Sequence, residues 1–312
     1  MCSLDLKMNF RKISNLKDDW RNLLNLTPGS IPFLSYEWFK SYYKTILEVE
    51  PEIMVFSNNG NIVGIIPGII KNETIKLLSD SRITDINDLI YIPGYEEKII
   101  KEFSTYIMNE DLHLDLFPIR EDSILIRLLP SFLEGLSINR TDLSPMLTLS
   151  PSWDKYLEGL NGKVRHELRR KLRKASGVYI KNLNPDEVEI LFKLMSDSDI
   201  NKRDFLSMEI RNFFIEITRS FFARKWLRLR ATYLNSHPVG IILAFHSKKH
   251  VYLYNTGYDP DFSYLSPGIV TIALDIKDAI EKRFNYYNFL RGGEDFKFQF
   301  GAKEHYAMRI MK

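Results

Sequence analysis

The sequence predicts a mixed α/β protein, with mixed α+β sheets, made of two tandem units at residues 1–150 and 151–312. Three observations lead to this prediction. Runs rich in β-branched and aromatic residues alternate with segments whose apolar residues recur every three or four positions. A hairpin pattern occurs once in each half, and the string Val-Gly-Ile-Ile follows its polar turn both times, at 63–66 and 239–242. The length of 312 residues leaves about 150 for each unit, an ordinary domain size.

The first half predicts four helices and a series of short strands. Periodic apolar residues place the helices near 17–26, 36–46, 96–108 and 122–133. The first hairpin joins strands at 53–57 and 62–70 through the polar turn 58–61. Further strands are expected at 74–78, 112–117 and 146–149.

The second half begins near Pro151 and Ser152, which form a helix-start signal before Trp153. A basic helix follows at 163–174, and its apolar stripe is Val164, Leu168 and Leu172. The remaining expected elements, in order, are a strand at 178–183, helices at 185–195 and 205–222, a hairpin of 226–234 with 238–246, a strand from 251, a helix to 280, and strands at 286–290 and 305–310.

Composition is typical of a globular enzyme. Hydrophobic residues make up 45% of the chain, and the net charge is only +3, so no global field selects a polyanionic partner. The single cysteine, Cys2, has no internal partner, which favours a reducing compartment. The first ten residues lack the apolar core of a signal peptide, and the longest apolar run, 62–70, is too short to span a bilayer. We therefore expect a cytoplasmic protein with no membrane span.

The segment from Val251 to Gly301 carries the clearest signal of function. It reads as a strand, a Ser-Pro-Gly turn, an amphipathic helix, a second strand and a polar loop. Ser266 occupies the expected N-cap and Pro267 the first helical position. Free N–H groups and the helix dipole attract phosphate at such a terminus. The segment therefore predicts an anion-binding unit.

This segment resembles the C-terminal half of the FemAB-like and CelD/BioF2-like acyltransferases of the GNAT superfamily. The matching stretches are YLYNTGYDP at 252–260, YLSPG at 264–268 and NFLRGGEDFKFQFGA at 288–302. The basic helix resembles the one that opens this domain, and residues 32–43 and 79–89 are similar to two segments of the family's first half. The resemblance implies two tandem GNAT-like units, with the acyl donor bound by the second.

The loop at 291–297 is the first candidate for chemistry, because open α/β sheets place their sites after the carboxyl ends of strands. Lys297 could hold a phosphate or an oxyanion, and Glu294 or Asp295 could take a proton from an attacking group. Arg291 is a candidate substrate-binding residue in the same loop. An exposed polar turn is the alternative interpretation. The family pattern supports Lys297 most directly.

Tyrosines and aspartates form further candidate sets. Tyr254 could donate a proton to a leaving thiolate, and Tyr258 lies at the expected mouth of the donor site. The chain has sixteen tyrosines, which favours packing as the explanation for either one. The resemblance places Asp85 and Asp88 in the loop that would hold the acceptor, and a capping or turn role is the alternative. The family usually has an aromatic residue where this chain has Ile86.

The basic helix has seven basic residues and one acidic residue, Glu167, between positions 163 and 174. It is either a solvated surface or a binding surface for CoA phosphates or tRNA. The resemblance favours Arg165 and Arg169 as binding residues. The six histidines show no metal-ligand spacing, so no metal is expected.

The resemblance implies transfer of an acyl group from acyl-CoA to an amine or hydroxyl acceptor, which is a small molecule or a cell-envelope precursor. The donor's phosphates would rest against Ser266, Pro267 and Gly268. One difference matters here. Ordinary GNAT chains have a basic, glycine-rich loop at this point, whereas residues 259–264 are acidic and aromatic. Two alternatives therefore stay open: an aminoacyl-tRNA-dependent transferase of the Fem type, and a non-catalytic module that binds an anionic polymer.

Overall fold

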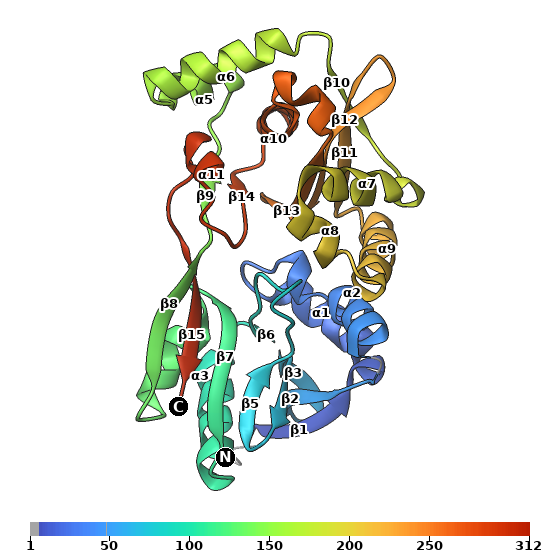
Figure 1. The fold of residues 1–312 in the computed structure, drawn as a ribbon. Helices are drawn as coiled ribbons and strands as arrows, with labels where there is room; N and C mark the ends of the chain where they lie inside the picture. The colour runs from blue at the N-terminus through green and yellow to red at the C-terminus, as the bar shows by residue number, and fades with distance from the viewer. Residues whose placement is uncertain (1–5, 48) are drawn as a thin grey trace. The chain divides into compact units, whose positions relative to one another are not determined.

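The computed structural model describes residues 6–47 and 49–312, so the prediction about Cys2 lies outside the described residues. The chain divides into two compact units (Figure 1). Unit 1 comprises Met1–Leu143 together with Tyr306–Lys312, and unit 2 comprises Ser144–His305. The predicted boundary at 150 thus lies at 143/144. The terminal strand, expected to complete the second unit, belongs to the first.

Unit 1 contains two sheets. The first has the order β1-β2-β3-β6, formed by Lys7–Lys12, Glu52–Asn58, Asn61–Ile66 and Ile90–Tyr91. The second has the order β4-β5-β7-β15-β8, formed by Gly68–Lys71, Thr74–Leu77, His113–Arg120, Tyr306–Met311 and Ser137–Leu143. The helices are α1 (Lys17–Leu26), α2 (Tyr36–Tyr42), α3 (Glu96–Asn109) and α4 (Ile124–Leu128). Helices α3 and α4 contribute to a core that includes Phe56, Phe103 and Ile310.

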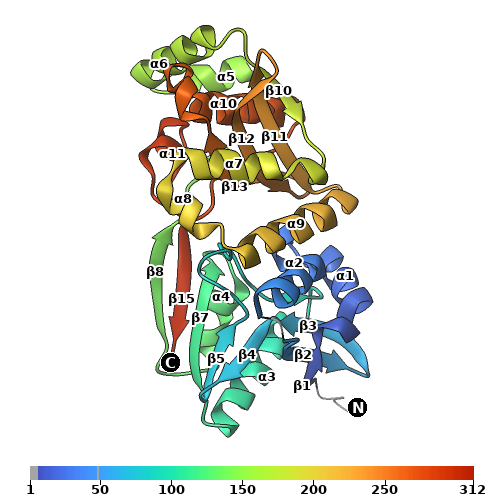
Figure 2. The ribbon, with the colours of Figure 1, turned by 45° about the vertical axis from the view of Figure 1, so that its right-hand side comes forward.

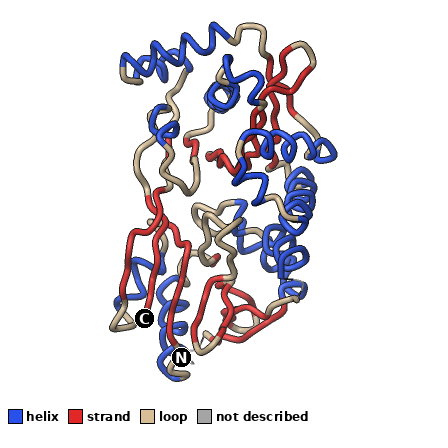
Figure 3. The backbone as a smooth tube through the Cα atoms, viewed as in Figure 1, coloured by secondary structure: helices blue, strands red, loops and turns tan. Residues whose placement is uncertain are grey.

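Unit 2 is built on one six-stranded sheet of order β10-β11-β12-β13-β14-β9. Its strands are Tyr179–Asn182, Leu227–Leu234, His237–His246, His250–Tyr258, Tyr286–Asn288 and Met146–Thr148, and only the β13–β14 pair is parallel. Its helices are α5 (Trp153–Gly159), α6 (Gly162–Lys174), α7 (Glu189–Ser198), α8 (Ile200–Phe205), α9 (Met208–Ala223), α10 (Pro267–Glu281) and α11 (Asp295–Gln299). Figure 3 shows how helices and strands alternate within each unit.

Helices α7 and α10 cover opposite faces of the unit 2 sheet, and glycines allow both to pack closely. A Cβ on Gly240 of β12 would lie 2.4 Å from Oγ1 of Thr271 in α10, and a Cβ on Gly257 of β13 would lie 2.5 Å from the backbone of α7. Gly257 pairs with Ile241, the neighbour of Gly240, so the two glycines face opposite sides. Figure 2 shows α7 crossing the sheet.

The repeated Val-Gly-Ile-Ile string has the same structural role in both units. Each copy lies in the second strand of an antiparallel hairpin, β2–β3 or β11–β12. In unit 1, a Cβ on Gly64 would lie 2.6 Å from Cδ1 of Ile99 in α3, as one on Gly240 would crowd α10. The short string therefore marks where a helix packs closely on its strand. The predicted fold class of two tandem α/β units is confirmed.

Three other sequence predictions differ from the structure. The run 62–70 is divided between β3 and β4, which belong to different sheets, because Pro67 has no N–H to continue a ladder. The strand near Met146, expected in the first half, pairs with β14 in the sheet of unit 2. The loop predicted at 291–297 ends in the short helix α11, which begins at Asp295.

The ladder between β13 and β14 ends early and leaves a gap in the sheet. The last pair is Tyr252 with Asn288, whereas β13 continues to Tyr258 on β12 alone. Tyr254 is the extra residue of a bulge, because Leu253 and Asn255 face consecutive residues of β12. Among the described strands, none pairs with this edge of β13 beyond Tyr252, and we refer to it below as the open edge of β13.

Candidate functional site

The N-terminus of α10 lies where β13 leaves the sheet and the chain turns back. Ser266 adopts the left-handed conformation (φ 54°), and its side chain makes no capping hydrogen bond to the first turn. Pro267 and Gly268 follow, and a Cβ on Gly268 would lie 3.5 Å from the ring of Tyr258. The prediction of Ser266 at the N-cap and Pro267 at the first helical position is correct. The side chain of Ser266 therefore does not cap the positive end of the α10 dipole.

The corresponding helix of unit 1 has a different N-terminus. The first turn of α3 contains Glu96 and Glu97, and Glu96 accepts a hydrogen bond from the N–H of Gly94 at 2.7 Å. The first turn of α10 contains no acidic residue. Carboxylates repel an incoming anion and already satisfy the dipole at α3. Of these two helix termini, only that of α10 is suited to bind phosphate.

A groove of about 450 Å³ lies beside this terminus. Val164 and Leu168 of α6, Ile269 of α10 and Phe300 after α11 give it apolar walls. Polar side chains also line it: Lys163, Glu167, Lys171 and Gln299. An apolar channel edged by cations next to a helix N-terminus can hold an extended ligand with anionic groups at one end.

The acidic loop before α10 does not turn its first carboxylate toward this groove. Asp259 is buried, and its Oδ1 accepts the N–H of Asp261 at 3.0 Å. Its Oδ2 lies 2.8 Å from Nε2 of His237. Burial opposes ionisation of Asp259, but these hydrogen bonds outweigh it and hold the pKa of the carboxyl below its usual range. Asp259 therefore stabilises its own turn.

Lys297 is buried and organises the loop that follows β14. Its ammonium donates to the carbonyl oxygens of Arg291 at 2.9 Å and Gly292 at 3.0 Å, and Nζ lies 2.9 Å from the carboxylate of Glu294. Glu294 is mostly exposed. The structure thus brings Lys297, Glu294 and Arg291 together, as the sequence predicts. Because Lys297 already binds two carbonyls and a carboxylate, it shapes the loop rather than presenting a free cation.

Tyr254, at the bulge of β13, packs among aromatic rings. Its ring centroid lies 5.7 Å from that of Phe214 and 5.3 Å from that of Phe245. The side chain is half-buried, at the start of the open edge of β13. Tyr254 therefore packs against other aromatic rings and also lies near the open edge of β13.

The basic surface of α6 is exposed, but its two candidate arginines differ. Arg165 donates to the carbonyl of Glu158 at 3.0 Å, which fixes it against α5. Arg169 is exposed on the outer side of the helix. Glu167 binds Arg170 through both oxygens at 2.7 Å, and this ion pair holds the pKa of the carboxyl at about 2. The single acid of the helix is therefore already paired.

Asp85 and Asp88 belong to unit 1, apart from the other candidates, which all lie in unit 2. Asp88 is buried, and its Oδ1 accepts from Oγ of Ser123 at 2.6 Å and from the N–H of Leu89 at 2.9 Å. Burial raises the pKa of Asp88 to about 6, although Arg120 and these hydrogen bonds oppose the shift. Asp85 is half-buried in the same loop.

Sequence reasoning missed two features of unit 2. The first is a buried charge network in which Asp275 of α10 accepts from Arg228 at 2.5 Å and Arg230 at 2.6 Å, both on β11. The alternation in Arg228-Leu229-Arg230 could have indicated two arginines on one side of a strand. The second is Lys202 of α8, which donates to Thr256 at the open edge of β13. Lys202 lies between the predicted helices at 185–195 and 205–222, where the sequence gave no signal.

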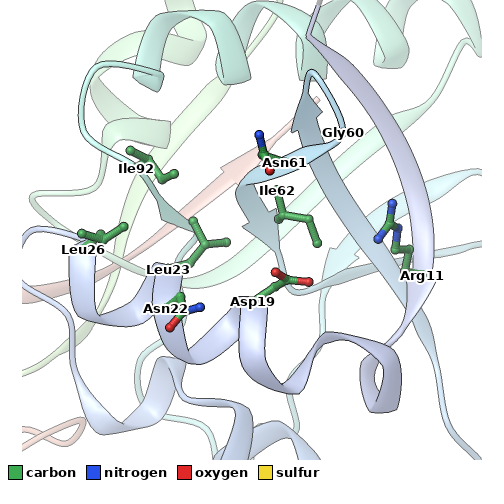
Figure 4. A pocket seen from close by; sticks show the side chains of 9 residues that line it. All are labelled: Arg11, Asp19, Asn22, Leu23, Leu26, Gly60, Asn61, Ile62 and Ile92. Atoms are coloured by element: carbon green, nitrogen blue, oxygen red, sulfur yellow. The ribbon is translucent and has the colours of Figure 1, made fainter.

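Unit 1 contains a smaller hollow of about 210 Å³ against α1 (Figure 4). Arg11, Asp19, Asn22 and Asn61 supply its polar side chains, and the last three are exposed. Asp19 belongs to the first turn of α1, so the helix N-terminus beside this hollow carries an acidic residue. Within residues 6–47 and 49–312, no cluster of three or more His, Cys, Asp or Glu is arranged to hold a metal ion. In the same part of the chain, no helix has the length and apolar character needed to cross a membrane.

Comparison with known families identifies the second unit. Residues 162–298, from α6 to α11, match the family model of the acetyltransferase (GNAT) domain. Unit 2 therefore contains a GNAT domain. Its GNAT domain contains the α10 terminus, the groove, the open edge of β13 and the Lys297 loop. No curated protein matches the chain by sequence.

Solved structures show that the two-unit fold extends beyond the GNAT domain. FemX matches with a TM-score of 0.67 at 10% identity, over 97% of this chain and 96% of its own. A conserved protein of unknown function from Bacteroides thetaiotaomicron matches with 0.63 at 11% identity, over 98% and 99%. L-PGS from Bacillus licheniformis matches with 0.54 at 10% identity, over 80% of each chain. At such low identity these similarities establish the fold alone.

Proposed function

We propose that this GNAT domain transfers an acyl group from acyl-CoA to an amine or hydroxyl acceptor, and that the donor binds in unit 2. The observation that carries the proposal is the groove beside the N-terminus of α10, with Lys163 and Lys171 at its edge. GNAT folds generally use acyl-CoA. The donor's phosphates would bind the uncapped terminus at Ser266, Pro267 and Gly268, close to the ring of Tyr258.

The open edge of β13 completes this proposal. Beyond Tyr252, the backbone groups on that side of β13 have no partner in β14. The thioester carbonyl could accept from one of these N–H groups, which would stabilise the developing oxyanion. The acceptor nucleophile would bond to the carbonyl carbon, the C–S bond would break, and the thiolate would leave. Lys297 would keep the Arg291–Glu294 loop in shape beside the reacting groups.

The acidic loop, which made CoA doubtful from the sequence, is compatible with this donor. Asp259 is committed to Asp261 and His237, and Lys163 and Lys171 supply positive charge from α6 instead of from the loop. We propose that α6 takes over the role of the basic loop of ordinary GNAT chains.

An aminoacyl-tRNA donor is the second candidate, and the exposed basic surface of α6 favours it. Arg169, Arg173 and Lys174 are exposed in the last two turns of this helix. Relatives of the FemAB-like type take their acyl group from aminoacyl-tRNA. Binding of tRNA through this surface would weaken steeply with salt, because counterions are released from the phosphates. A polymer-binding module without catalysis predicts the same salt dependence but no turnover.

Thermal stabilisation by ligands distinguishes these candidates. Acetyl-CoA, a longer acyl-CoA and bulk aminoacylated tRNA are each added at low and moderate salt. We expect acyl-CoA to raise the melting temperature at both salt concentrations, and Lys171→Glu to weaken its binding by roughly tenfold. Lys248→Glu makes the same charge change on the exposed β12–β13 turn and serves as the control. Stabilisation by tRNA alone, lost at moderate salt, would contradict the acyl-CoA proposal.

A further inference from the structure

Lys202 is a half-buried lysine of α8 whose amine lies against the open edge of β13. Its Nζ lies 2.7 Å from the carbonyl oxygen and 3.3 Å from Oγ1 of Thr256. Thr256 lies on β13 beyond Tyr252, where the ladder with β14 has ended. The amine is therefore held by the stretch of β13 backbone with which β14 does not pair. A lysine that only kept the surface soluble would extend into water instead.

The charged groups around Lys202 come from two sides of this gap. Asp199 caps α8 from its own side, and Oδ1 of Asp199 accepts the N–H of Asn201 at 2.8 Å. Glu294 contributes from the loop after β14, where Nζ of Lys297 lies 2.9 Å from its carboxylate. Both carboxylates thus have other partners. From β13, the groups that contact the amine are the two neutral oxygens of Thr256.

We propose that the amine of Lys202 is the general base of acyl transfer, which accepts the proton of the attacking amine or hydroxyl. This role deepens the proposed function and depends on it. The acceptor's oxygen or nitrogen forms a bond to the acyl carbon, and its proton passes to the lone pair of Lys202. The bond from the acyl carbon to the donor's sulfur breaks, and the thiolate leaves with the electron pair. The ammonium of Lys202 then returns the proton to the thiolate or to water.

The hydrogen bonds of Lys202 suit a neutral amine. Burial lowers the pKa of Lys202, and the carboxylates of Asp199 and Glu294 oppose this shift. A neutral amine has two N–H groups, which the two oxygens of Thr256 can accept, and one lone pair. With both donors directed at Thr256, the lone pair points away from it. A general base has to present its lone pair to the proton of the acceptor.

The first test measures the protonation state of Lys202 without any substrate. The full chain is labelled with ¹³C-lysine, and the Cε resonance that is missing in Lys202→Arg is assigned to Lys202. We expect the midpoint of its titration to lie below the value of about 10.4 for an unperturbed lysine. An unshifted midpoint would refute the base role.

The second test separates the base from the rest of the site with two acceptors for acetyl-CoA. Hydroxylamine is neutral at pH 7 and a strong nucleophile, so its acetylation needs little help from a base. Water needs that help. We expect Lys202→Arg, which keeps the donors to Thr256 but cannot lose its proton, to retain hydroxamate formation. With water as the acceptor, the rate of thiol release by Lys202→Arg should fall at least tenfold. That rate should also no longer rise with pH.

The outcomes distinguish the two proposals. If the wild type forms no hydroxamate and releases no thiol from acetyl-CoA, the acyl-CoA proposal fails, and the base role fails with it. If the wild type is active and Lys202→Arg keeps the same rate and pH profile with water, the base role alone fails, and Lys202 is a positioning residue. Lys202→Met, which removes both charge and hydrogen bonds, should lose water turnover as Lys202→Arg does. Rescue by arginine but not by methionine would therefore contradict the proposal.

Discussion

The charge network under α10 predicts a large loss of stability when its central carboxylate is removed. Asp275 is fully buried and accepts from Arg228, Arg230 and the hydroxyl of Tyr287, the last at 2.9 Å. Asp278 is the other acid of the network, 2.9 Å from Arg228 and 3.2 Å from Arg230. In Asp275→Ala, two buried guanidinium groups would share one peripheral carboxylate.

Breaking a buried ion pair by removing one partner costs about 3–5 kcal/mol, because a buried charge is left uncompensated. We take about 4 kcal/mol, since Asp278 retains some compensation for both arginines. Unit 2 has about 160 residues, and its entropy of unfolding is roughly 0.3 kcal/mol per kelvin. The melting temperature of unit 2 should therefore fall by about 12 °C.

Differential scanning calorimetry of the full chain measures this change and reports whether the two units melt separately. Asp278→Ala is the matched control, because it removes an acid from the same helix whose side chain is partly exposed. It should cost about 1 kcal/mol, since Asp275 remains to neutralise the arginines. A decrease of less than about 3 °C in Asp275→Ala would refute the reasoning.

Three further predictions concern pH and the Lys297 loop. The pKa of Asp88 is raised to about 6 from an ordinary 3.8, so the stability it contributes is present below pH 4 and lost as the pH rises through 6. At pH 7 this costs roughly 3 kcal/mol, and Asp88→Asn should be more stable than the wild type in urea at pH 7 but not at pH 4. Burial, together with Arg228 and Lys282, lowers the pKa of His246 to about 4, so its contribution is present above pH 6.5 and lost as the pH falls through 4. In His246→Gln, the loss of unfolding free energy at low pH should be smaller by up to roughly 3 kcal/mol. An unchanged fall of the melting temperature of unit 2 with decreasing pH would contradict this. Lys297→Met should cost about 1–3 kcal/mol, because the carbonyls of Arg291 and Gly292 lose their donor. It should also speed hydrogen exchange in the loop, and unchanged exchange there would count against the loop-shaping role of Lys297.

The sequence is a good guide to local structure in this chain. Both hairpins lie within a few residues of their predicted positions, because each has a polar turn between two β-rich runs. Helix α10 begins at Pro267 as expected, since Ser-Pro-Gly is a strong start signal. The repeated string identified the duplication, because a glycine is needed where a helix packs closely on a strand.

Non-local pairing and burial were harder to predict. The sequence contains no marker that assigns the terminal strand to the sheet of β7 and β8 instead of to unit 2. Strand β7 lies nearly two hundred residues earlier in the chain. The sequence places Lys297 in the polar loop after β14, but its partners are carbonyls of that same loop, which spacing alone does not reveal. Lys202 was missed because its burial depends on a neighbouring strand edge some fifty residues away.

The position of β15 has a consequence for the order in which the protein is made. This strand lies between β7 and β8 inside a sheet of unit 1, yet it follows the whole of unit 2 in the chain. A ribosome therefore finishes unit 2 before it has supplied the strand that completes unit 1. Domains usually fold in order from the N-terminus during synthesis. Here unit 2 can fold first, while the earlier-made unit waits for its last strand with an unpaired edge on both β7 and β8.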